Sequence, residues 1–137
     1  MTAPAKGGYF VDPVAAVNSI TDAIADNPYL VLIGPGVYTL TQALIMKPFV
    51  TMAGSGQEAT ILTGVISSDE SDETSSIVSG ADNSTLCDLS IVNNGGSIYS
   101  MALYNDHGSP VIQDVTATTS GGNCSRSVYN SCSSPGV

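Results

Sequence analysis

Positive charge is the scarcest feature of this sequence. The 137 residues include only 3 Lys and Arg against 12 Asp and Glu, which gives a formal net charge of −9 at pH 7. A chain of this charge repels polyanions, so we expect no nucleic-acid partner and no acidic-polysaccharide partner without help from metal ions. Apolar residues make up 42% and charged residues 11%, a composition that argues against disorder and for one buried core.

Long apolar runs are also missing. No segment approaches the roughly 20 apolar residues that span a bilayer, and residues 1–10 lack the apolar stretch of a signal peptide. We therefore expect a soluble protein with no membrane partner. Its compartment is undetermined, and it would be secreted or displayed at the cell surface if an upstream signal had been removed. The three cysteines have no zinc-ligand spacing, and free thiols are favoured over a bridge between Cys124 and Cys132.

What the chain does contain is one segment written twice. Residues 86–96 recur 26 positions later as residues 112–122, with apolar residues, an aspartate (Asp88 and Asp114) and a Gly-Gly pair in matching places. A fixed period of this size indicates a solenoid, and short β-rich units between Gly, Asn, Asp and Ser turns indicate a parallel β-helix. We predict an all-β solenoid of about four coils, right-handed by the general crossover preference.

A second pair of repeats predicts side-chain ladders. Tyr104 and Asn105 recur as Tyr129 and Asn130. On adjacent coils, about 4.8 Å apart, stacked tyrosines bury area and stacked amides satisfy one another, so a structural role is favoured. An exposed ladder also offers ring faces and amides to a neutral sugar, which makes these four residues the candidate carbohydrate-binding site.

The N-terminal part differs from the coils. After a lead-in over residues 1–11, Asp12-Pro13 has the form of a helix start, with an Asp N-cap and Pro in the first helical position. Apolar residues then recur at helical spacing at Val17, Ile20 and Ile24. We predict a capping helix within residues 12–27 that covers the open end of the first coil. Residues 28–137 would form the coils of the same single domain.

An acidic stretch interrupts the coils at residues 67–76. It contains the carboxylates Asp69, Glu70, Asp72 and Glu73. A solvated loop is the favoured interpretation, and a Ca²⁺ site is the alternative, because Ca²⁺ prefers several carboxylate oxygens. The stretch lacks the spacing of a known calcium loop, and nothing else in the sequence calls for a cofactor.

The segments before this stretch resemble a known family. They comprise the helix, the apolar run 30–33, the turn Gly34-Pro35-Gly36, and the runs 44–46, 50–56 and 60–64. Together, over residues 12–64, they look like the start of pectin-lyase-like right-handed β-helix proteins, and the later repeats resemble uncharacterised bacterial β-helix repeat proteins. The resemblance implies the fold, which hosts lyases, hydrolases, esterases and non-catalytic adhesion modules.

Two constellations are candidates for chemistry. Asp88 and Asp114 would lie on adjacent coils, with carboxylates at about the 5 Å separation of a retaining glycosidase pair. Aligning residues 61–65 with residues 85–89 also places Gly64 at this corner, where Gly and Asp tolerate positive φ. A ladder bonded to local backbone is favoured over catalysis. His107, the only histidine, follows an aspartate, as in a general-base pairing, but the Gly-Ser-Pro turn after it favours a surface position.

The supply of basic residues decides between the function classes. The polygalacturonate-cleaving proteins that the N-terminal part resembles use basic residues to hold their anionic sugar. Here Lys6, Lys47 and Arg126 are the whole supply, in three separate segments. We predict a non-catalytic structural or surface-recognition module, or the N-terminal part of a longer β-helix. The alternative is a polysaccharide-active lyase or hydrolase, or a fragment of one.

The C-terminal end predicts self-association. Only seven residues follow Asn130, and they are too few and too polar to cover the cross-section of a β-helix. An uncovered coil exposes backbone groups that invite pairing. We expect either a chain that continues past Val137 or copies that meet end to end.

Overall fold

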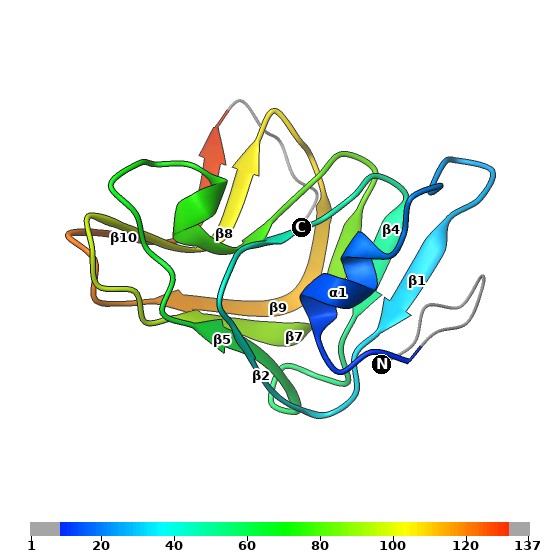
Figure 1. The fold of residues 1–137 in the computed structure, drawn as a ribbon, viewed down its shortest axis with the longest axis horizontal. Helices are drawn as coiled ribbons and strands as arrows, with labels where there is room; N and C mark the ends of the chain where they lie inside the picture. Colours follow the sequence, from blue (N-terminus) through cyan, green and yellow to red (C-terminus); the bar gives the residue numbers. More distant parts are fainter. Residues whose placement is uncertain (1–8, 132–137) are drawn as a thin grey trace.

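The computed structural model describes residues 9–131, which form a parallel β-solenoid of about four turns (Figure 1). The first coil holds β1 (Tyr29–Leu32), β2 (Gly36–Leu40) and β3 (Leu44–Ile45). The second holds β4 (Val50–Ala53), β5 (Thr60–Gly64) and β6 (Ser76–Ser79). The third holds β7 (Thr85–Asn93) and β8 (Tyr99–Asp106), and the fourth holds β9 (Val111–Thr119) and β10 (Cys124–Ser131).

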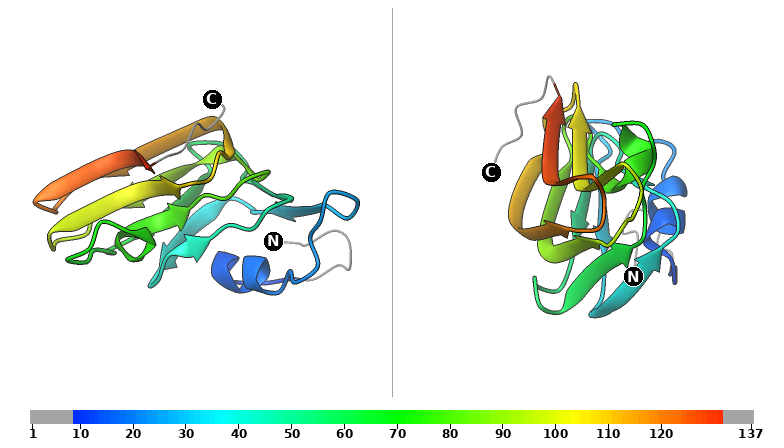
Figure 2. Two further views of the ribbon diagram at one scale, coloured as in Figure 1. Left: turned by 90° about the horizontal axis from the view of Figure 1, so that it is seen from above. Right: turned by 90° about the vertical axis from the view of Figure 1, so that its left-hand side faces the viewer.

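Every ladder between coils is parallel. One sheet runs β1-β4-β7-β5-β2, with β9 paired to β7, and the other runs β10-β8-β6-β3. The long strands β7 and β9 bend, so that the first half of β7 pairs with β4 and the second half with β5. Figure 2 shows the coils stacked side by side, from the N-terminal coil to β10. The predicted β-solenoid is confirmed.

The repeat found in the sequence sets the register between coils three and four. Leu86 pairs with Ile112 and Asn93 with Thr119, so the two copies stack residue on residue. Tyr104 likewise pairs with Tyr129, and Asn105 with Asn130. The predicted ladders are therefore present.

One predicted alignment is wrong. Gly64 pairs with Asn93, at the far end of β7, and not with Asp88. In the second coil, residues 54–59 form a loop between β4 and β5 at this corner. In the third and fourth coils, a single aspartate forms the bend within β7 or β9. Asp88 and Asp114 adopt φ of 58° and 51° there, a left-handed conformation that Asp tolerates better than most residues. The prediction failed because it aligned residues 61–65 with residues 85–89 although the 54–59 loop has no counterpart in coil three.

The core is built from inward-facing rows that run across the coils. Val31, Met52 and Leu86 form one row, and all three are fully buried. A second row, formed by Leu44, Val78, Leu103 and Val128, is buried except for Val128, which is 44% exposed. Burial thus falls off at coil four, because no further coil within the described residues covers it.

The N-terminal helix exists but is shorter than predicted. α1 spans Pro13–Asn18, with the Asp12 carboxylate accepting from the Val14 N–H as the N-cap. Val17 and Ile20 are buried in the common core, and α1 contacts β3 at the edge of its sheet. Ile24 is 56% exposed, so its predicted packing over the first coil is wrong.

Tertiary contacts end the helix early. The Lys47 ammonium donates to the carbonyls of Asn18 and Ile20, which a longer helix would have used for its own N–H groups. The Tyr29 hydroxyl donates to the Asp22 carboxylate at 2.6 Å and holds the following segment in place. No helix in residues 9–131 is long and apolar enough to cross a membrane.

Candidate functional site

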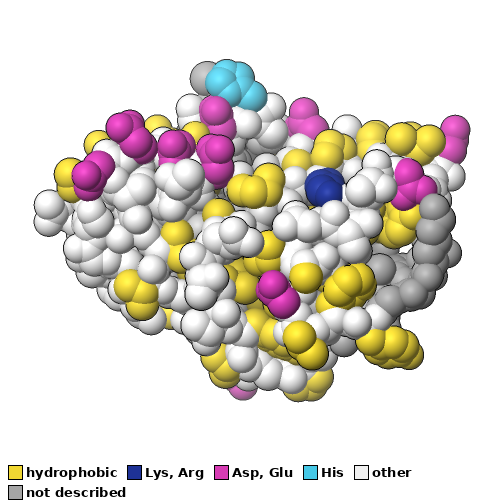
Figure 3. Space-filling model, viewed as in Figure 1, with side chains coloured by type: hydrophobic (Ala, Val, Ile, Leu, Met, Phe, Trp, Pro, Cys, Tyr) yellow, Lys and Arg dark blue, Asp and Glu magenta, His cyan; other side chains and the backbone are white. Residues whose placement is uncertain are grey.

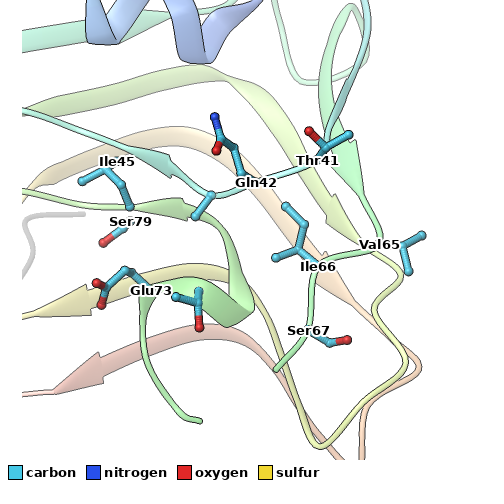
Figure 4. Close-up of a pocket in the computed structure, with 10 residues that line it drawn as sticks. Thr41, Gln42, Ile45, Val65, Ile66, Ser67, Glu73 and Ser79 are labelled. Atoms are coloured by element: carbon cyan, nitrogen blue, oxygen red, sulfur yellow. The ribbon is translucent and has the colours of Figure 1, made fainter. Parts of the chain in front are cut away.

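A cavity of about 520 Å³ opens on the outer face of the β3–β6 part of the sheet (Figure 4). We call it the outer cavity; it is lined by Thr41, Gln42, Ala43, Ile45, Val65, Ile66, Ser67, Glu73, Thr74 and Ser79. Its floor comes from the strands, because Ile45 pairs with Ser79 on neighbouring coils. Its other walls come from the 41–43 turn and from the acidic excursion between β5 and β6.

Local hydrogen bonds hold the acidic excursion in shape. The Asp72 carboxylate caps the 3₁₀ turn η1 (Glu73–Ser75) by accepting from the Thr74 N–H at 2.9 Å. Ser68 forms an antiparallel bridge with Tyr99, and the Ser97 hydroxyl donates to the Asp69 carboxylate. The predicted loop is thus an ordered wall of the cavity.

A buried asparagine fixes the opposite end of this wall. Asn93 Oδ1 accepts from the Ile66 N–H at 3.0 Å, while Nδ2 donates to the Ile66 carbonyl at 2.7 Å. Nδ2 also donates to the carbonyls of Met101 and Ser75. One side chain therefore joins the backbones of coils two and three beside the cavity.

The charged part of the outer cavity's lining is acidic. Glu73 lines it, and no Lys or Arg is among its lining residues. Figure 3 shows acidic side chains gathered over this end of the molecule. The same negative charge acts on Tyr104, which lies nearby. Burial, and then the charges of Asp106 and Glu73, raise the pKa of its phenol above the usual value. The cavity offers hydroxyl, amide and carboxylate groups beside apolar Ile45 and Val65.

The Tyr–Asn ladder lies on the same sheet, further along the coils. Tyr104 and Tyr129 stack with ring centroids 5.6 Å apart and planes within 9°. The Arg126 guanidinium lies over the Tyr129 ring, 4.7 Å from its centroid. Asn105 Nδ2 donates to Asn130 Oδ1 at 2.8 Å. Both ladders thus have the stacked geometry that the repeats predict.

Burial limits what the ladder can offer to a sugar. Tyr104 is 6% exposed and Asn105 is fully buried, so neither ring face nor amide of this pair reaches solvent. Only Tyr129 and Asn130, on the last described coil, remain accessible, and the Tyr129 ring already has two partners. Carbohydrate binding by the ladder itself stays a prediction, now restricted to these two residues.

The paired aspartates lie at a corner of the solenoid, and no ion pair between either of them and a Lys or Arg is found in residues 9–131. Asp88 and Asp114 occupy equivalent positions between paired neighbours, as predicted. Burial, a hydrogen bond to the Asp88 side chain, and the charges of Asp88 and Asp114 raise the pKa of the adjacent Cys87 thiol. Cys87 is therefore no ready nucleophile at neutral pH. Cys87 and Cys124 are free thiols, while Cys132 lies outside the described residues.

The remaining candidates do not assemble into a site. His107 Nδ1 contacts the Asp106 carboxylate at 2.7 Å, but the imidazole is 75% exposed in a turn. Asp69, Glu70, Asp72 and Glu73 form no metal-binding cluster, since residues 9–131 contain no group of three His, Cys, Asp or Glu suited to an ion. The Ca²⁺ alternative stays a prediction.

Sequence reasoning missed Asn93, Lys47 and the outer cavity. Asn93 resembles the many other turn-type residues of the sequence, and three of its four partner residues lie 8–27 positions away in the chain. The only available signal was its place at the end of a repeated apolar run, where the equivalent residue in the next coil is Thr119. The cavity could not be predicted from the repeats, because the loop that forms part of it does not repeat.

Comparison with known proteins identifies the fold. No family model matches the sequence, and no curated protein matches it. Two crystal structures of pectin methylesterase do match in three dimensions, one a point mutant in complex with hexasaccharide IV and the other in complex with hexasaccharide VII. Each superposes with a TM-score of 0.65 and 18% sequence identity, over 83% of this chain and 40% of that chain. The chain thus spans less than half the length of these structures, and it has the right-handed β-helix fold of pectin-lyase-like proteins.

Proposed function

We propose that this protein is a non-catalytic carbohydrate-recognition β-helix that holds a sugar in the outer cavity. The observation that carries the proposal is the lining itself, which places Glu73, Gln42 and several hydroxyls around the apolar side chains of Ile45 and Val65. Sugars present hydroxyl groups together with apolar C–H surfaces, and a cavity of this size matches a mono- or disaccharide unit.

The charge of the cavity selects among sugars. With Glu73 in the lining and no cation beside it, an acidic sugar would place two like charges together at short range. A neutral or basic sugar instead gains charge-assisted hydrogen bonds to the carboxylate. The expected ligand class therefore differs from polygalacturonate.

Isothermal titration against neutral oligosaccharides, an amino-sugar oligomer and polygalacturonate tests the proposal. We expect binding to a neutral or basic oligomer that weakens about tenfold or more in Glu73→Gln. Glu70→Gln, in the same excursion but outside the cavity, is the matched control and should bind normally. Binding that is equal in the wild type and Glu73→Gln, or that is confined to polygalacturonate, would refute the outer cavity as the site.

An enzymatic function rests on a different observation, the stacking of Asp88 over Asp114. Acidic groups on adjacent coils of a fold shared with pectin methylesterase make a pectin-directed hydrolytic activity the second candidate. We expect no release of methanol or of reducing ends from methyl-esterified pectin or polygalacturonate, with or without Ca²⁺. Release that Asp88→Asn or Asp114→Asn abolishes would establish the enzyme instead.

A further inference from the structure

One outward face of the solenoid carries a regular array of side chains. It lies on β2, β5 and the second halves of β7 and β9, which are neighbours in this order (Figure 1). The residues between its rows, Leu62 and Ile91 among them, are buried, so the rows face outward. We call these rows the threonine array; the first holds Val37, Ile61, Ser90 and Thr116, and the second holds Thr39, Thr63, Val92 and Thr118.

The array has fixed spacings in two directions. Adjacent coils are about 4.8 Å apart, and residues two positions apart on a strand are about 7 Å apart. All members except Ser90 are β-branched, and such side chains have few χ1 rotamers. Their methyl and hydroxyl groups are therefore held in place before anything binds, which lowers the entropic cost of binding.

Strand propensity alone does not account for this composition. The first halves of β7 and β9, together with β1 and β4, present a second outward face on the same coils. Its rows hold Leu30, Thr51, Thr85 and Val111, and Leu32, Ala53, Cys87 and Gln113. That face mixes long, small and amide side chains, and most of its residues are not β-branched. The regularity thus belongs to the threonine array and not to the strands in general.

The hydroxyl groups of the array are available to water. By contrast, Thr60 and Thr119, on the same strands, donate to backbone carbonyls. Ser90 is covered, since its hydroxyl donates to the Gln57 carbonyl of the 54–59 loop. Within residues 9–131, four hydroxyls of the array form no hydrogen bond with the protein, namely those of Thr39, Thr63, Thr116 and Thr118.

The chemistry of the array selects its partner. None of its eight residues is charged or aromatic, although the chain as a whole has a net charge of −9. Interfaces between proteins are enriched in aromatic residues, Met and Arg, and sugar sites use aromatic faces, so neither partner fits this surface. An uncharged, ordered surface of methyl and hydroxyl groups instead matches ordered water, because a charge would require a hydration shell of its own.

We propose that the threonine array binds ice. Water molecules on a prism face of ice repeat in two perpendicular directions at spacings similar to those of the array. Methyl groups restrict the orientation of their first-shell water, and each hydroxyl both donates and accepts a hydrogen bond. The array thus holds water in an arrangement close to that of the ice surface, and this water joins the lattice when the protein and the crystal meet.

Slow growth of ice from a dilute solution of the full chain tests the proposal. Growing ice excludes ordinary soluble proteins, so the fraction of the chain in the ice is compared with that of serum albumin in the same solution. We expect the chain to be enriched in the ice and to slow the recrystallisation of ice in a frozen sucrose solution. Exclusion from the ice to the same extent as albumin would overturn the proposal.

A matched set of variants locates the surface. Thr118→Lys places a charge and a long side chain in the array, so the fraction in the ice should fall to that of albumin. Thr118→Val keeps the branched shape and should retain most of the enrichment. Ser127→Lys, at an exposed position of β10 on the other sheet of the same coil, should behave like the wild type. Equal losses in Thr118→Lys and Ser127→Lys would overturn the assignment to the array.

Thr39→Lys repeats the test on the first coil, away from Thr118. Circular dichroism shows whether each variant is folded, and a folded Thr39→Lys or Thr118→Lys that keeps the full enrichment would contradict the proposal. The wild-type measurement decides the question even if both variants unfold.

Crystalline cellulose and chitin are the competing surfaces. Thr118-dependent pelleting with either, without enrichment in ice, would make the array a polysaccharide surface and overturn the proposal. Glu73→Gln removes the sugar contact proposed for the outer cavity and should leave the enrichment in ice unchanged, so the two proposals fail separately. A loss in Glu73→Gln as large as that in Thr118→Lys would contradict an ice-binding site on the array.

Discussion

Coil three places a buried asparagine at the end of β7 and another near the end of β8, and the two are satisfied very differently. Asn93 makes hydrogen bonds through both its Oδ1 and its Nδ2, to backbone groups of coils two and three. Asn105 makes one, to Asn130, and its Oδ1 has no partner. The difference lies in the neighbour on coil two.

Beside Asn93, the backbone of Ile66 on coil two forms hydrogen bonds with the side chain. Beside Asn105, coil two places Gly80, which has no side chain. A Cβ atom on Gly80 would stand 2.1 Å from Asn105 Oδ1, so the amide fills the space that this glycine leaves. A buried amide stabilises a coil junction when it is hydrogen-bonded and costs free energy when it only fills volume. The two positions should therefore respond to mutation by different amounts.

The largest expected effect is that of Asn93→Ala. It would leave the N–H groups of Ile66 and Gly95 and the carbonyls of Ile66 and Met101 without their partner, so we expect a loss of about 3–5 kcal/mol in the free energy of unfolding. Urea denaturation measures it. Asn94→Ala, at the exposed neighbouring residue, should cost less than about 0.5 kcal/mol, and similar losses for both would show that the network contributes little.

Gly80→Ala should come next, at about 1–3 kcal/mol, because the added methyl group collides with Asn105 Oδ1 and approaches Pro110 Cγ to 2.8 Å. Adding Asn105→Ala to it should recover part of the loss, since the side chain in the way is removed. The coupling energy from the double-mutant cycle is the readout. Strict additivity would mean that the two residues do not compete for the same space.

Asn105→Ala alone should cost about 1 kcal/mol or less. It removes one hydrogen bond but also relieves an unpaired buried oxygen, and these contributions oppose each other. The same urea series measures it beside Asn93→Ala. A loss as large as that of Asn93→Ala would erase the distinction between the two positions.

The smallest effect concerns pH and Tyr104, next to Asn105. Its pKa in the folded protein is raised above the ordinary 10.0, so the folded state keeps the phenol proton where the unfolded chain loses it. The resulting stabilisation is complete below pH 10 and is lost as the pH rises toward the folded pKa. Melting temperatures between pH 8 and 11 should fall less steeply in Tyr104→Phe than in the wild type. Tyr9→Phe, at a tyrosine that is 89% exposed, should follow the wild-type slope.

Much of the fold was predictable because the sequence repeats with the period of one coil. The 26-residue repeat stacks Leu86 on Ile112, and the tyrosine repeat places Tyr104 under Tyr129, so matching letters in the sequence became neighbours in space. The predictions were wrong where the structure is set by tertiary contacts and not by the sequence repeat. Lys47 ends α1 early by binding carbonyls nearly 30 residues away, and the 54–59 loop shifts the alignment of coil two.

The site was less predictable for the same reason. The sequence analysis selected Asp88, Asp114 and the tyrosines because they repeat. In a solenoid, however, a repeated residue mostly indicates stacking between coils and not a functional site. The outer cavity depends on Glu73 and Ile66, which belong to an excursion that occurs once. Its position depends in turn on the hydrogen bonds that Asn93 makes to Ile66.

The residue-for-residue register of β7 on β9 also has a genetic consequence. A duplication of the 26 codons from residue 86 to residue 111 would insert one complete turn, with Asp at the corner and apolar residues facing inward, and this turn would pair with coil three on one side and with coil four on the other. Deletion of the same 26 residues would also remove one turn, but it would take away Asn93, Ser97 and Tyr99, which hold Ile66, Asp69 and Ser68 in place. The protein can therefore gain whole coils through recombination between its own repeats, and such a gain leaves the contacts of coil three with the acidic excursion in place.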